Sequence, residues 1–266
     1  MGSRARFHCT VMAAALVCVP GAAFAQNRSD DNAITQAEDA FGFAVGRESL
    51  GIYNAGQARG FSPTAAGNFL GSRAFSHSRT WNAQMARAFV EGMQTNGIAA
   101  TAKHFPGLGL ASGNTDKGRI VIRAAAWKLH QGLLPFHAAV QAGVKLVMVS
   151  TAVYPRLDGS KRPAAFSSTI IGGLLRRQLG FTGVTVTDSL TAPAADRIPH
   201  TATRAMLAGS DLLIFGAESA SERGYATLLA DEAGSVRLQN RLTVAASRIR
   251  ALKAWLAESG GSTCTG

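Results

Sequence analysis

From residue 79 onward the chain alternates between amphipathic stretches and short apolar runs, whereas residues 26–70 show no such rhythm. Trp81, Met85 and Phe89 recur at helical spacing, which predicts a helix with these residues on one face. Short apolar runs between glycine or polar residues are typical of buried parallel strands. The pattern predicts helices over 80–94, 129–141, 167–179 and 201–208, a closing helix over 242–256, and strands over 98–102, 145–150, 184–187 and 211–215.

This alternation predicts an α/β domain built on a parallel sheet, and four strands are half the number in a complete barrel. Residues 26–72 lack the pattern that would supply the other four strands. We therefore expect a partial TIM-like (β/α)8 barrel, mainly its C-terminal half, over residues 73–258. Because a barrel removes sheet edges only by closing, this half would expose two edges and could self-associate through them.

Two of the predicted strands end at ionisable residues. Lys103 and His104 follow the run over 98–102, and Asp188 follows the run over 184–187. In a barrel of parallel strands, side chains at the carboxyl ends of the strands form the active site. These three residues are therefore candidates for catalysis or binding. The alternatives are that Asp188 caps the next turn and that the Lys-His pair is structural.

The sequence around these residues resembles glycoside hydrolase family 3, in the branch that includes bacterial β-N-acetylhexosaminidases. The resemblance extends from about residue 71 to about residue 256, through the strings Lys103-His-Phe-Pro-Gly-Leu-Gly109, Val147-Met-Val-Ser-Thr151 and Thr187-Asp-Ser-Leu190. It implies a retaining glycosidase that removes terminal β-linked sugars, with N-acetylglucosamine favoured over glucose. It implies a carbohydrate substrate and neither a cofactor nor a metal. The alternative function is a chimeric or truncated exported fragment without enzymatic activity.

The resemblance also implies roles for single residues. Asp188 corresponds to the carboxylate nucleophile that forms a glycosyl-enzyme intermediate. Lys103 and His104 correspond to ligands of the sugar hydroxyl groups, and Arg73, in Arg73-Ala-Phe-Ser76, corresponds to an arginine that helps to hold the substrate.

The proton-transfer group departs from the family pattern. The branch carries an Asp-x-His pair in the loop after the Lys-His string, where this chain has Asn114 and Asp116. Asn114 cannot ionise, so Asp116 is the candidate acid/base, provided that burial raises its pKa. The alternative is that Asp116 caps the loop. Leu108 and Ser189 likewise replace a His and an Asp of the family.

The two ends of the chain carry other signals. Residues 1–25 are typical of a secretory signal, with Arg4 and Arg6 before an apolar stretch and Ala23-Phe-Ala25 as the cleavage site. We therefore expect a periplasmic or secreted bacterial protein, and the apolar stretch is too short for a stable membrane span. Residues 26–70 resemble a plug segment of TonB-dependent receptors, as in Ala58-Arg-Gly-Phe-Ser-Pro63. Residues 259–266 are expected to form a flexible tail.

Composition narrows the choice of partners. The hydrophobic fraction of 47% suits a globular core, and the formal charge is +11. Such a charge could attract anionic polymers or nucleic acid. The basic residues are scattered, however, and no run of five or more occurs, so general solvation of the surface is favoured over nucleic-acid binding. Without the leader only Cys264 remains, which excludes an intrachain disulfide and a cysteine metal site.

Overall fold

The computed structural model describes residues 75–196 and 198–260. The contacts of the chain divide it into residues 1–30 and residues 31–266, and all described residues belong to the second unit. The predicted leader, the plug-like segment, Arg73 and positions 261–266 of the predicted tail lie outside the described residues.

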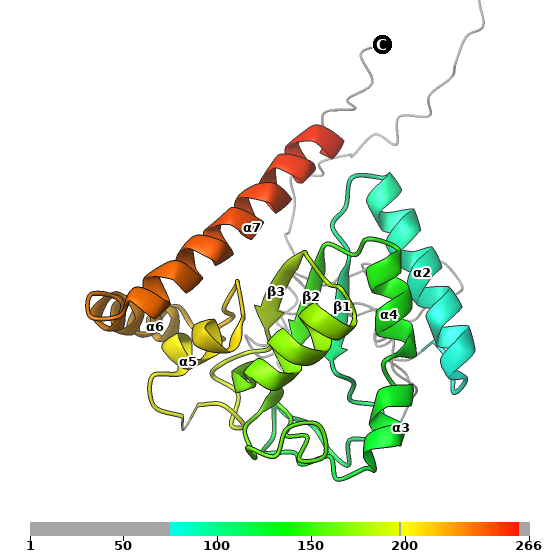
Figure 1. Ribbon diagram of the computed structural model, residues 1–266, viewed down its shortest axis with the longest axis horizontal. Coiled ribbons are helices and arrows are strands. Elements are labelled where there is room, and N and C mark those ends of the chain that lie inside the picture. Colours follow the sequence, from blue (N-terminus) through cyan, green and yellow to red (C-terminus); the bar gives the residue numbers. More distant parts are fainter. Residues whose placement is uncertain (1–74, 197, 261–266) are drawn as a thin grey trace, which may run out of the picture. The chain divides into compact units, whose positions relative to one another are not determined.

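A small parallel sheet forms the centre of the described part of the chain (Figure 1). It consists of β1 (Thr101–Phe105), β2 (Leu146–Val149) and β3 (Val184–Thr187), in the order β1-β2-β3. Every residue of the three strands is buried. Phe105 pairs with Val149, which pairs with Thr187, so the carboxyl ends of the strands lie level at one edge. This arrangement confirms a parallel α/β fold of partial-barrel type.

Helices cover the sheet and continue beyond it. They are α2 (Arg79–Thr95), α3 (Ala126–Gln131), α4 (Leu134–Gln141), the 3-10 turn η2 (Ala164–Phe166), the π-type helix η3 (Thr169–Gln178), α5 (Thr201–Ala208), α6 (Glu218–Glu232) and α7 (Val236–Gly260). In Figure 1, α2 and α4 lie side by side near β1, and α5, α6 and α7 gather beyond β3. The helix α7 reaches Gly260, two residues into the predicted tail.

The main core lies between the sheet and these helices. The rings of Phe105 on β1 and Phe136 on α4 meet edge to face, with centroids 5.1 Å apart, and both side chains are fully buried. Burial of an aromatic side chain of this size contributes about 2 to 3 kcal/mol. Such contacts fix the first strand, and with it the candidate site residues that it carries.

The helix α2 begins and ends within one residue of its prediction, but only part of the predicted apolar face turns toward the core: Met85 and Phe89 are half-buried, and Phe89 packs against the main core. The buried residues are Asn82, Ala83, Ala86 and Val90, whereas Trp81 is 53% exposed. Small side chains allow α2 to pack closely on its neighbours, and the large side chain of Trp81 is left to the surface.

The predicted helix over 129–141 is two helices, α3 and α4, separated by Gly132 and Leu133. Pro135 lies in the first turn of α4, where a backbone N–H has no partner within the helix, so its absence costs nothing. In the interior of an unbroken helix the same proline would remove a hydrogen bond. The proline therefore favours a new helix that begins at residue 134 over a continuation of α3.

The predicted strand over 211–215 is wrong. Only a single bridge joins Leu212 to Val186, so the sheet of the described residues has three strands rather than four. Backbone bonds still join this segment to β3, from the Leu212 N–H to the Thr185 carbonyl at 3.0 Å and from the Thr187 N–H to the Leu212 carbonyl at 3.1 Å, and side chains add to them. The Asp211 carboxylate accepts the Thr185 N–H at 2.9 Å, and Thr187 Oγ1 accepts the Ile214 N–H at 3.0 Å. Together these bonds hold the segment beside β3, although the regular pairing is limited to one bridge.

Candidate active site

Asp188 is the first residue after β3, as predicted, and only 2% of it is exposed. Its N–H donates to the Val149 carbonyl at 2.9 Å, which holds the residue beside the end of β2. One carboxylate oxygen accepts the Ser189 N–H at 2.8 Å, and Thr151 Oγ1 lies 3.4 Å from the other. Because this donor is a backbone N–H, it is present even though Ser189 replaces an Asp of the family. The carboxylate is thus fixed at the carboxyl edge of the sheet.

Lys103 and His104 lie inside β1 and not after it. The predicted strand over 98–102 is displaced to Thr101–Phe105, and the two residues are only 2% and 4% exposed. Since neighbouring strands are about 4.8 Å apart, the β1 backbone lies about 10 Å from that of β3. The sheet therefore brings Lys103, His104 and Asp188 to the same edge.

Tyr154 is a further residue of this edge that the sequence did not indicate. Its side chain is fully buried, and its hydroxyl donates to the Gly107 carbonyl at 3.0 Å. Burial raises the pKa of Tyr154 well above its usual value; a hydrogen bond with Ser150 opposes this rise, and the nearby charge of Asp188 adds to it. The phenol therefore remains a donor at neutral pH and ties the loop after β1 to the segment after β2. A single tyrosine in an apolar run usually belongs to the hydrophobic core, so the sequence around Tyr154 did not indicate a functional role.

The loop that carries the candidate acid/base is closed by a side chain. Asn114 Oδ1 accepts the N–H of Asp116 at 2.9 Å, which is the geometry of an Asx turn. Asp116 is half-buried, and Leu108, at the start of the loop, is buried. Asn114 therefore closes the turn without needing to ionise. The assignment of Asp116 as the acid/base stays a prediction, as does the role of Arg73.

Two further features bear on the class of site. Among the residues that the structure describes, no group of three or more His, Cys, Asp or Glu side chains could hold a metal ion. No helix between residues 75 and 260 is both long and apolar enough to cross a membrane.

The sequence matches the model of the glycosyl hydrolase family 3 N-terminal domain over residues 22–252. The chain therefore belongs to glycosyl hydrolase family 3. The match starts well before residue 71, where the motif resemblance begins, and so includes the whole segment over 26–70. These matches give no support to the receptor-plug resemblance of that segment.

The curated relatives are glycosidases by name. A β-hexosaminidase of Thioalkalivibrio sulfidiphilus is 36% identical over 148 residues, which is 54% of this chain and 42% of the relative. A β-N-acetylglucosaminidase/β-glucosidase of Cellulomonas fimi is 35% identical over 205 residues, or 70% of this chain and 35% of the relative. The chain thus spans less than half the length of these relatives.

Solved structures agree with the fold. A family 3 β-N-acetylglucosaminidase from a Paenibacillus species superposes with a TM-score of 0.69 at 31% identity, covering 78% of this chain and 40% of the other. A β-N-acetylhexosaminidase from Beutenbergia cavernae gives a TM-score of 0.64 at 35% identity, covering 69% of this chain and 55% of the other. Both likenesses support the partial-barrel interpretation.

Proposed function

We propose that this chain hydrolyses terminal β-linked sugars by a retaining mechanism, with N-acetylglucosamine favoured and glucose next. The observation that carries the proposal is Asp188, buried at the carboxyl end of β3 within the nucleophile string of the family. The names of the relatives, which include both β-hexosaminidase and β-glucosidase, support the order of the two sugars.

In this mechanism one Asp188 oxygen attacks the anomeric carbon while the bond to the leaving group breaks. The Ser189 N–H and the Thr151 hydroxyl stabilise the carboxylate as an anion, both before attack and when water later releases the sugar. Lys103 and His104 bind the sugar hydroxyl groups, together with Arg73. Asp116 protonates the leaving oxygen and then removes a proton from the attacking water.

The setting that we propose is the bacterial periplasm or the medium outside the cell, in carbohydrate metabolism or cell-wall turnover. The support is the leader pattern over residues 1–25 and a relative from Arthroderma benhamiae, 34% identical, whose name is uncharacterized secreted glycosyl hydrolase.

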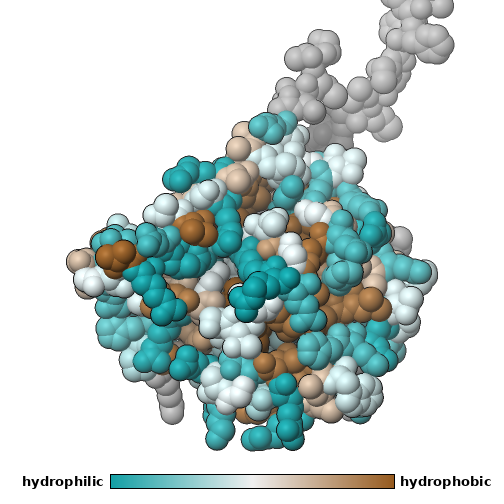
Figure 2. Space-filling model, viewed as in Figure 1, coloured by the Kyte–Doolittle hydropathy of each residue, from teal (hydrophilic) through white to brown (hydrophobic). Residues whose placement is uncertain are grey.

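Self-association is part of the proposal. In the described sheet β1 pairs with β2 alone, which leaves its other edge without a strand. Figure 2 shows hydrophobic side chains at the surface where α6 and α7 meet, and Tyr225 and Val236 are 67% and 70% exposed. Light scattering on the full chain should give a mass above that of one copy. A compact monomer at high concentration would contradict this.

The glycosidase proposal is tested with p-nitrophenyl β-N-acetylglucosaminide and the matching β-glucoside. Asp188→Ala should lower kcat by roughly 10⁴-fold or more, because the covalent step is lost. Asp196→Ala, which removes an exposed carboxylate from the next loop, is the matched control and should turn over like the unaltered chain. If the unaltered chain hydrolyses neither substrate, the alternative of an inactive fragment is favoured. If Asp188→Ala remains active, the nucleophile is another residue.

A further inference from the structure

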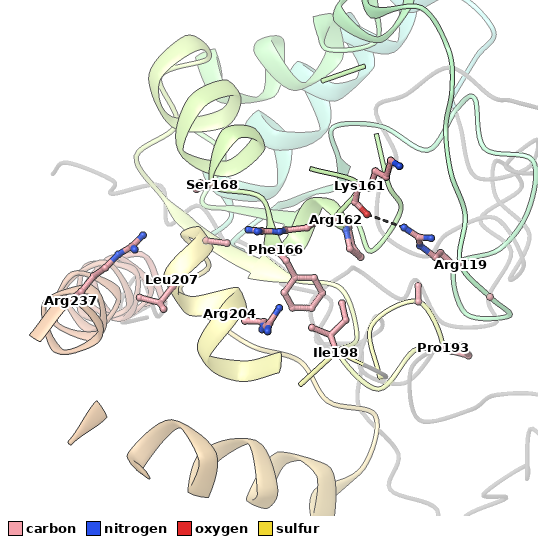
Figure 3. Close-up of a pocket in the computed structure, with 14 residues that line it drawn as sticks. Arg119, Lys161, Arg162, Phe166, Ser168, Pro193, Ile198, Arg204, Leu207 and Arg237 are labelled. Atoms are coloured by element: carbon pink, nitrogen blue, oxygen red, sulfur yellow. Dashed lines mark hydrogen bonds between the residues drawn. The ribbon is translucent and has the colours of Figure 1, made fainter. Parts of the chain in front are cut away.

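A cavity of about 920 Å³ has a strongly basic lining (Figure 3). Five cationic side chains line it, and none of the described lining residues is Asp or Glu. The cations are Arg119, Lys161, Arg162, Arg204 and Arg237. The residues of the candidate active site, Lys103, His104, Asp116 and Asp188, are not among those that line it.

Separate segments of the chain build this pocket. In Figure 3, Arg237 and Leu207 lie at one end and Arg119 and Pro193 at the other, with Phe166 and Arg204 between them. Arg119 Nη2 donates to the Lys161 carbonyl at 2.9 Å, so two of the basic segments are tied together. The charges are thus distributed along the cavity instead of meeting at one point.

The pocket is anchored to the segment that follows β2. The N–H of Ala165 donates to the Ser150 carbonyl at 3.0 Å, and the N–H of Ala164 donates to the Ala152 carbonyl at 2.8 Å. Phe166, one residue further on, is buried in the pocket wall. These bonds fix the wall of the pocket to the same layer of the structure that carries Thr151 and Tyr154.

An acidic residue near the pocket interacts with only one of its cations. Partial burial acts to raise the pKa of Asp158, but hydrogen bonds from Ser167 and Ser160 and the charge of Arg162 outweigh burial, so the pKa is lowered. Asp158 itself does not line the cavity. No Asp or Glu among the described lining residues offsets the other four cations, so an anionic ligand would supply the missing counter-charge.

We propose that this pocket binds a ligand with two or more phosphate or carboxylate groups, such as an acidic saccharide. Guanidinium groups match both anions because their paired N–H donors bind two oxygens at once. A single small anion could reach only some of the cations, because they span the cavity. The apolar side chains of Phe166 and Ile198 suit the uncharged part of such a ligand. The volume lies within the range of ligand pockets in general.

The test is calorimetric titration of the full chain with pyrophosphate and, separately, with citrate. The double variant Arg204→Gln/Arg237→Gln should weaken binding by about tenfold or more, because charge-assisted hydrogen bonds are lost. Arg250→Gln is the matched control, since Arg250 is exposed on the same helix as Arg237 but does not line the pocket. It should change the affinity less than about twofold. Binding of pyrophosphate alone assigns a phosphate ligand, and binding of citrate alone assigns a carboxylate ligand.

Absence of binding by both probes, or equal weakening by Arg250→Gln and by the double variant, overturns the proposal. If the double variant does not fold, Arg119→Gln/Arg162→Gln in the exposed loops replaces it, with the same expected loss. Hydrolysis of an uncharged aryl glycoside by either double variant should stay within about twofold of the unaltered chain, if that chain is active. The pocket can thus be tested whether or not the glycosidase proposal holds.

Discussion

A buried aspartate lies near each end of β3, but the two carboxylates have different surroundings. Asp188, at the carboxyl end, accepts hydrogen bonds from the Ser189 N–H and the Thr151 hydroxyl, which are neutral groups. The Asp211 side chain, beside the amino end, is fully buried and accepts from the Thr185 N–H and from arginines. The same residue type therefore occurs in two electrostatic environments, one with neutral donors and one with cationic donors.

Three arginines contact Asp211. Arg176 of η3 lies 2.7 Å away, and Arg241 and Arg248 of α7 lie 2.5 and 3.0 Å away. Burial lowers the pKa of Arg176 to about 10; the charge of Asp211 opposes this shift, and the other two arginines add to it. Arg176 thus remains charged at neutral pH. The cluster joins two helices to β3, which suits the stabilising role of the amino-terminal face of a barrel.

The largest effect on stability is expected for Asp211→Ala. Removing this carboxylate leaves three largely buried guanidinium groups around an empty position, so we expect a loss of about 3 to 5 kcal/mol in the free energy of unfolding. Chemical denaturation of the full chain, followed by circular dichroism, measures the loss.

The control is Asp231→Ala, which removes a partly exposed pair with His200 and should shift the unfolding transition far less. An equal shift for both variants would show that the Asp211 cluster does not stabilise the fold. Asp188→Ala should leave the transition close to that of the unaltered chain if its role is chemical.

Substitution of Asp116 tests the proposed chemistry at the carboxyl end of the sheet, and its expected effect on activity is smaller than that of Asp188→Ala. Asp116→Ala should lower kcat/KM about 100-fold for an alkyl glycoside, whose leaving group needs a proton, and far less for a p-nitrophenyl glycoside. Asp116→Asn has nearly the same shape and retains the backbone N–H that binds Asn114. It should behave like the alanine variant if the acid is required. Normal rates for Asp116→Asn with both substrates would make Asp116 a structural residue.

Local signals in the sequence predicted much of the fold. Val184–Thr187 and Thr201–Ala208 occur where they were predicted, because a glycine or a polar residue bounds each element and no competing pattern overlaps it. Asp188 was placed correctly for the same reason, since it directly follows an uninterrupted buried strand. Helix α6 was not predicted, and its apolar residues show little periodicity on one face.

Features that depend on distant contacts could not be predicted. Lys103 and His104 interrupt the apolar run of β1 but are buried within it, because strand pairing extends past them to Phe105. The basic residues look scattered along the chain, yet Arg119, Arg204 and Arg237 line one cavity. The salt-bridge cluster around Asp211 depends on residues up to 37 positions away in the sequence. Only folding brings such groups together.

The central claim is that Asp188 forms a covalent bond to the sugar. The most direct measurement is mass spectrometry of the full chain after incubation with an activated 5-fluoro glycosyl fluoride of N-acetylglucosamine, which slows release of the intermediate. We predict one added sugar per chain, located by peptide mapping on the peptide that contains Asp188 and absent from Asp188→Ala. A sugar attached to another carboxylate, or no adduct in a chain that turns over aryl glycosides, would contradict the account.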